Sequence, residues 1–190
     1  MKDAQALLLD AIAAEARGQR ALLDGDAETA ADAMRAAADG YRRSWEVAPP
    51  TSYGRLVGML KAAVIAGDAE AEAAYARGAL PDAPESPTAG YAVAVAALVQ
   101  GDDAGAAAAA RGMRAAGPAF VRAADAVEAL ATGDANAYAA AVAAIVADFE
   151  ARERHLTGVP IADTALMLER LAEPRGLACR PRSPLLPALP

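Results

Sequence analysis

Apolar residues recur every three or four positions through most of the chain. Leu7, Leu8, Ala11 and Ile12 show this spacing near the start. It is typical of amphipathic helices, and glycine, proline or a capping side chain marks where such segments begin and end. The pattern predicts about nine helices, over residues 3–23, 26–47, 51–66, 68–80, 86–99, 102–116, 120–132, 134–154 and 160–173.

Four of the predicted helix ends carry the same dipeptide, Gly25-Asp26, Gly67-Asp68, Gly101-Asp102 and Gly133-Asp134. Glycine ends a helix at low cost in the left-handed conformation, and the following aspartate can cap the next helix. Each dipeptide therefore predicts the corner of an antiparallel helical hairpin. Thr51 or Ser52 is expected to cap the third helix, and Ser86 the fifth.

The corners lie 34 residues apart between Gly67 and Gly101, and 32 between Gly101 and Gly133. This spacing resembles a tetratricopeptide repeat. Tryptophan is missing from the start of each unit, and the interval from Gly25 to Gly67 is 42 residues. We therefore predict an all-α fold of hairpins stacked in a TPR-like or irregular solenoid arrangement.

Prolines mark the other boundaries. Pro49-Pro50 ends the second helix, and residues 81–87 are expected to form a loop. We predict one helical domain over residues 1–176. Residues 177–190 are expected to form an extended Pro-rich tail along its surface, with residues 177–180 as a short extended piece.

Charge and composition limit the possible partners. The formal net charge is −7 and the isoelectric point is near 4.7, which argues against a nucleic-acid partner, because phosphate binding needs a positive surface. The longest uncharged apolar runs are too short to span a bilayer, so no membrane partner is expected. A lone cysteine, Cys179, suits a reducing compartment, and we expect a cytoplasmic protein.

One segment combines aromatic and basic residues, and it falls in the long first interval. Tryptophan, tyrosine and arginine dominate binding hot spots, which makes the segment our candidate partner surface. The alternative is that its aromatic rings fill a gap in the core that alanine leaves. The residues are Tyr41, Arg42, Arg43, Trp45, Tyr53 and Arg55.

We assign no catalytic, cofactor-binding or metal-binding residue. His155 is the sole histidine, and we interpret it as a cation near the end of a charged helix. The aspartates after the corner glycines are explained as caps. Cys179 stands in the Pro-rich tail with no histidine nearby in sequence, which indicates an inert thiol.

Residues 133–152 (GDANAYAAAVAAIVADFEAR) and 168–187 (LERLAEPRGLACRPRSPLLP) resemble immunity family forty-nine, the all-helical antidotes of bacterial polymorphic toxins. The shared features are a final helix, Gly176 after a charged turn, and an extended end, Ser183 to Pro187. The resemblance implies a non-enzymatic protein that binds a toxin. Two alternatives stay open: a TPR-like adaptor or self-assembling scaffold that holds a peptide or forms a homodimer, and a helical enzyme with a carboxylate site.

Overall fold

The computed structural model describes residues 3–81 and 84–187 and confirms the all-α prediction. Residues 1–2 of the predicted domain, 82–83 of the predicted loop and 188–190 of the predicted tail lie outside the described residues. Within the described residues there are nine α-helices and two short 3₁₀ helices. Their bounds are α1 Ala4–Leu23, α2 Ala27–Glu46, α3 Gly54–Ala66, α4 Glu70–Ala79, α5 Pro87–Val99, α6 Asp103–Met113, η1 Arg114–Ala116, α7 Pro118–Thr132, α8 Ala135–Glu150, α9 Asp163–Ala172 and η2 Glu173–Arg175.

All four predicted corners form. The corner glycines have φ angles of +73° to +84°, in the left-handed region. At each corner the glycine N–H and the aspartate N–H donate to carbonyls of the preceding helix, as in Gly25 to Leu22 (3.2 Å) and Asp26 to Ala21 (2.9 Å). This is the Schellman pattern, which satisfies carbonyls that a helix end would otherwise leave free.

A capping residue was predicted for six helix starts. Four of these predictions are confirmed and two were wrong. The side chains of Asp26, Ser86, Asp102 and Asp134 accept backbone N–H bonds in the first turns of α2, α5, α6 and α8. Asp68 does not cap α4, because Ala69 lies between it and the first helical residue.

The third helix also begins later than predicted. Tyr53 stands at the cap position of α3, without a side-chain cap. Thr51 has a φ angle of +69°, and the Ser52 hydroxyl donates to the Pro49 carbonyl at 2.8 Å. Both residues therefore belong to the turn that follows Pro49-Pro50, and the prediction that one of them caps α3 was wrong.

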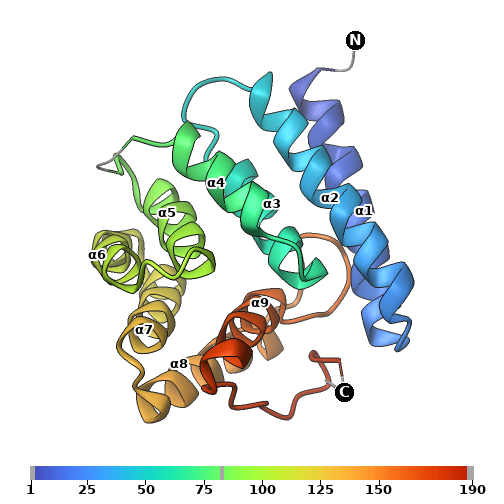
Figure 1. Ribbon diagram of the computed structural model, residues 1–190. Coiled ribbons are helices and arrows are strands. Elements are labelled where there is room, and N and C mark those ends of the chain that lie inside the picture. Colours follow the sequence, from blue (N-terminus) through green and yellow to red (C-terminus); the bar gives the residue numbers. More distant parts are fainter. Residues whose placement is uncertain (1–2, 82–83, 188–190) are drawn as a thin grey trace.

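The hairpins follow one another along an arc, with α1 and α2 at one end and α7 and α8 at the other (Figure 1). Helix α9 lies in the hollow of this arc, where it contacts α3, α7 and α8. Most of its residues are buried there, including Asp163 and Glu169, whose carboxylates find partners in Lys61 of α3 and Tyr138 of α8. The inner face of the stack is therefore covered by the chain's own helix.

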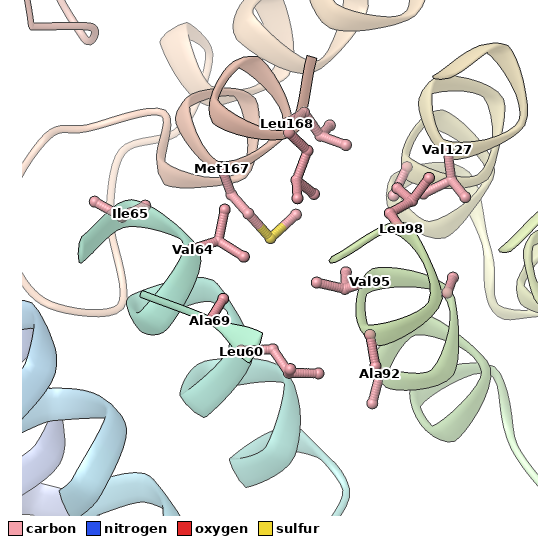
Figure 2. Packing of buried hydrophobic residues seen from close by; sticks show 14 of the residues in the cluster. Leu60, Val64, Ile65, Ala69, Ala92, Val95, Leu98, Val127, Met167 and Leu168 are labelled. Atoms are coloured by element: carbon pink, nitrogen blue, oxygen red, sulfur yellow. The ribbon is translucent and has the colours of Figure 1, made fainter. Parts of the chain in front are cut away.

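The centre of the core lies between α3, α5 and α9. Figure 2 shows Met167 of α9 pointing between Val64 of α3 and Val95 of α5, while Leu168 points toward Leu98. Met167 and Leu168 have at most 1% of their surface exposed. Most other core positions are alanine, which lets helices approach closely and leaves the stability to many small contacts.

After Gly176 the chain turns back along α9. The Leu185 carbonyl accepts a hydrogen bond from the Ala162 N–H (2.9 Å), and the Ser183 hydroxyl donates to Glu150 at the end of α8 (2.7 Å). Leu177, Ala178 and Cys179 pack against the core, so the described part of the tail lies on the domain surface. Residues 177–180 form no strand, and Arg180 has a φ angle of +47°.

No helix within residues 3–81 and 84–187 combines the length and the apolar content that a membrane span requires.

Candidate functional site

A crevice of about 430 Å³ opens where three Gly-Asp corners meet the end of α9. We call it the corner crevice. Its floor and walls are mainly apolar, and its charged residues stand on α4, α9 and η2. The lining residues are Leu22, Ala27, Ala30, Ala31, Val64, Ile65, Ala66, Gly67, Ala69, Glu70, Leu98, Val99, Arg170, Leu171, Glu173, Pro174 and Arg175.

Arg175 fixes one wall of the corner crevice. Its guanidinium donates to the carbonyls of Leu171 (2.9 Å) and Leu98 (2.7 Å) and to the carboxylate of Asp103 (3.1 Å). These carbonyls stand in the last turns of α9 and α5, where helices leave acceptors free. The contacts tie η2 to the third corner, so this wall is positioned before any ligand arrives.

Arg170 has donors in the same wall that are not fully used. Its Nε atom is buried and has no hydrogen-bond partner, and its Nη1 atom lies 3.6 Å from Glu173. A buried donor without an acceptor is costly.

Exposed carboxylates, those of Asp26, Asp68, Asp102 and Glu70, stand near the corner crevice in the chain, although of them only Glu70 lines it. The three aspartates directly follow the corner glycines. Hydrogen bonds from Thr29 lower the pKa of Asp26 below its ordinary value, so this carboxylate stays charged in mildly acidic solution. The charges that line the crevice itself balance, with Glu70 and Glu173 against Arg170 and Arg175.

The predicted aromatic and basic surface lies at the opposite end of α2. There the Ser44 hydroxyl donates to the Ala4 carbonyl at 2.7 Å, at the start of α1. Tyr41 is 3% exposed and donates to Glu15 at 2.5 Å. Tyr53 is buried too, and its ring stacks on Trp45 with centroids 5.7 Å apart. The tyrosines of this group thus belong to the core, as the alternative interpretation proposed.

Each arginine of the predicted aromatic and basic surface contacts a side chain of the domain itself. Arg42 lies 4.0 Å above the Tyr75 ring, Arg43 pairs with Asp39 at 3.1 Å, and Arg55 donates to the Ser44 hydroxyl at 2.7 Å. Arg43 remains exposed, and Trp45 remains partly exposed. A partner contact by these two stays a prediction, but the group is not one continuous aromatic surface.

A buried ion cluster, which sequence analysis missed, joins distant parts of the chain. The Lys61 ammonium lies 2.5 Å from Asp163 and 3.2 Å from Glu15. The side chains of Lys61 and Asp163 are 13% and 11% exposed, and that of Glu15 is 0% exposed. The cluster therefore connects α1, α3 and α9, and Tyr41 adds α2 through its bond to Glu15.

The electrostatics of this cluster favour its charged form. Burial disfavours the Lys61 ammonium, but the carboxylates of Asp163 and Glu15 outweigh burial and raise the pKa of Lys61 above its ordinary value. Burial and the Glu15 charge raise the pKa of Tyr41, which stays protonated and donates. Neither the corner crevice nor the pocket beside the tail is lined by Glu15, Lys61 or Asp163. The geometry fits a structural role, in which the ion cluster holds these helices together.

Glu169 of α9 is a second buried carboxylate, 1% exposed, that holds the tail. It accepts hydrogen bonds from the Tyr138 hydroxyl (2.8 Å), the Arg180 N–H (2.6 Å) and the Cys179 N–H (3.3 Å). Two successive backbone N–H groups therefore point at one carboxylate, and Arg180 itself adopts the left-handed conformation. The predicted extended piece over residues 177–180 forms no strand, and its last residue departs from extended geometry.

Cys179 is expected to react slowly with alkylating reagents. Burial, and then the charge of Glu169, raises the pKa of its thiol from 9.0 to about 12. Because the thiolate is the reactive form, we expect iodoacetamide at pH 8 to modify the folded protein at least about a hundredfold more slowly than the urea-unfolded chain. Mass spectrometry measures both rates, and equal rates would contradict this.

The raised thiol pKa also has a consequence for stability. The folded form holds the proton more tightly, so this contribution is complete below pH 9.0 and is lost as the pH rises toward about 12.

The prediction that His155 stands near the end of a helix was wrong. Helix α8 ends at Glu150, and the imidazole packs with its centroid 6.1 Å from that of Phe149. Its Nδ1 atom is buried without a hydrogen-bond partner. Across the described residues, no three His, Cys, Asp or Glu side chains lie close enough together to hold a metal ion.

Comparisons with models of protein families, with curated proteins and with solved structures found no match to this chain.

Proposed function

We propose that the domain binds a protein partner in the corner crevice. The observation that carries the proposal is the crevice itself: a cleft of about 430 Å³ with mostly apolar lining residues and one wall fixed by Arg175, where three corners meet the end of α9. Protein interfaces combine an apolar centre with a polar rim in this way. The site takes an apolar side chain of the partner, and the acidic chain attracts basic residues around it.

The charge of the whole chain supports a basic partner. The chain carries a formal net charge of −7, and Asp26 and Asp68, which are exposed, each adjoin in sequence a residue that lines the crevice. Complementary charge speeds association and weakens with salt.

Among basic protein partners we propose a bacterial toxin domain. The resemblance of residues 133–152 and 168–187 to immunity family forty-nine supports this class. A titration of the protein with a toxin domain encoded beside its gene, at low salt, tests it. Saturable binding that inhibits the toxin is the expected result, and no binding would count against the toxin assignment.

In the alternative function, that of a TPR-like adaptor, a peptide would bind on the inner face of the stack. Helix α9 fills that face, so a peptide could bind there only by displacing α9 and its buried contacts to Lys61 and Tyr138. The corner crevice needs no such displacement, and for this reason we prefer it.

Ala27→Tyr is expected to block the crevice, because Ala27 is exposed at its edge. The matched control is Ala135→Tyr: both residues are exposed, each is the first residue of its helix, and each follows an aspartate cap. Peptides selected from a random displayed library on the wild-type protein should contain an apolar residue next to Lys or Arg. We expect Ala27→Tyr to weaken their binding by about tenfold or more, measured by fluorescence polarisation, and Ala135→Tyr to change it by less than about twofold.

Salt provides a second check. Raising the salt concentration from about 0.05 M to about 0.5 M should weaken peptide binding, because it screens the negative charge of the chain. Failure to enrich any peptide, or equal binding by the two tyrosine variants, would overturn the proposal.

A further inference from the structure

A second hollow, of about 350 Å³, lies between α9 and the tail. We call it the tail pocket. Its apolar walls come from Leu166 on α9 and from Pro181, Leu186 and Pro187 on the tail. It shares no lining residue with the corner crevice. The volume falls at the lower end of the range for sites that hold small molecules, which starts near about 300 Å³.

Two arginines, Arg180 and Arg182, stand at the tail pocket. Both residues are exposed, and within residues 3–81 and 84–187 neither guanidinium makes a hydrogen bond or an ion pair. In this acidic protein most other arginines near a cavity are paired, such as Arg114 with Asp125 and Arg122 with Asp148. The two guanidinium groups beside apolar walls therefore keep their donors unused.

The carboxylate of Glu169 also lines the tail pocket, but it is already occupied by neutral donors of the chain. The Tyr138 hydroxyl and the N–H groups of Cys179 and Arg180 donate to it at 2.6 to 3.3 Å, and the Cys179 thiol lies 3.3 Å away. Because these donors are neutral, their hydrogen bonds stabilise the Glu169 carboxylate but do not pair it with an arginine. The guanidinium groups are thus left for an external anion.

Arg180 occupies a conformation that glycine adopts more easily. Its φ angle is +47°, and the bond from its N–H to Glu169 holds it there. A non-glycine residue held in the left-handed region by its surroundings is a recurrent feature of ligand sites. The strain keeps the Arg180 side chain on the tail where the pocket opens.

The geometry points to a binding site for a small amphipathic anion. The apolar body of the ligand lies against Leu166, Leu186 and the tail prolines, and its carboxylate or phosphate head accepts hydrogen bonds from Arg180 and Arg182. The planar arginine fork matches both kinds of head group. This site does not depend on the corner crevice being a protein-binding surface.

Calorimetric titration of the full chain with decanoate, decyl phosphate and 1-decanol, each below its aggregation concentration, tests the proposal. We expect saturable binding of at least one anion with one molecule per chain, and at least about tenfold weaker binding of the uncharged alcohol. The stronger of the two anions identifies the head group. No saturable binding of either anion, or equal binding of decanol, would overturn the proposal.

Three variants locate the site. Arg180→Gly removes the guanidinium and suits the positive φ angle, so it should not disturb folding. We expect Arg180→Gly and Arg182→Gln each to weaken anion binding by about tenfold. Arg111→Gln, which removes an exposed arginine from α6, and Ala27→Tyr in the corner crevice should leave it unchanged. An equal loss in Arg111→Gln, or a loss confined to Ala27→Tyr, would place the anion elsewhere and contradict the assignment.

Discussion

Lys61→Met is expected to lower the free energy of unfolding at pH 7 by about 3 to 5 kcal/mol. Methionine has a similar shape but leaves Glu15 and Asp163 buried without a cation, although both lie within 3.2 Å of the ammonium in the wild-type protein. Removing one member of a buried ion cluster costs far more than the cluster adds to stability, because the remaining charges stay desolvated. Urea unfolding followed by circular dichroism measures the change.

The control is Arg35→Met, which breaks an exposed pair with Asp32 and should cost less than about 1 kcal/mol. A double variant, Lys61→Met with Asp163→Asn, should be more stable than the sum of the two single losses predicts, because the side chains are in contact. A Lys61→Met loss below about 1 kcal/mol would show that the cluster does not fasten the helices.

Glu169→Ala is expected to lower the free energy of unfolding by about 3 kcal/mol. It leaves the Tyr138 hydroxyl and the N–H groups of Cys179 and Arg180 without their acceptor. The Arg180 backbone also loses the bond that holds its positive φ angle. The tail should detach from α9 while the helices keep their packing.

The alkylation rate of Cys179 measures detachment of the tail independently of the free energy of unfolding. Burial raises its pKa most, and the Glu169 charge adds to the effect, so Glu169→Ala should speed its alkylation at pH 8 by about tenfold or more. Glu153→Ala removes an exposed carboxylate and serves as the control for both readouts. Unchanged alkylation in Glu169→Ala would mean that the carboxylate does not hold this part of the tail.

The corners could be predicted from sequence because their causes are local. A left-handed glycine and its two hydrogen bonds involve about six consecutive residues, from Ala21 to Asp26 at the first corner. The same reasoning failed at Asp68, where one extra alanine separates the aspartate from α4. The position of α9 depends on contacts across the chain, such as Lys61 to Asp163, which are 102 residues apart.

Some signals for the buried charges were nevertheless present. Lys61 is one of two lysines in the chain and the only charged residue between Leu56 and Gly67. Glu169 directly follows the apolar run from Ala165 to Leu168. A charged residue in such a setting must find a buried partner, although the sequence does not say which one.

The candidate site was harder to predict than the fold. The corner crevice is assembled from helix ends near residues 22–31, 64–70, 98–99 and 170–175, which have ordinary compositions when taken separately. Aromatic enrichment drew attention to the other end of α2. There, Tyr41 and Tyr53 are large side chains that fill space between helices otherwise rich in alanine.

Hydrogen exchange read by mass spectrometry, with and without a peptide selected on the protein, tests most directly whether the corner crevice is the binding surface. We expect slower exchange on binding in residues 27–31, 64–70 and 170–175, because the bound segment covers the helix ends that line the crevice. Residues 41–55 and 177–187 should exchange at their original rates. Slower exchange confined to residues 41–55 would place the partner on the aromatic and basic segment and contradict the account.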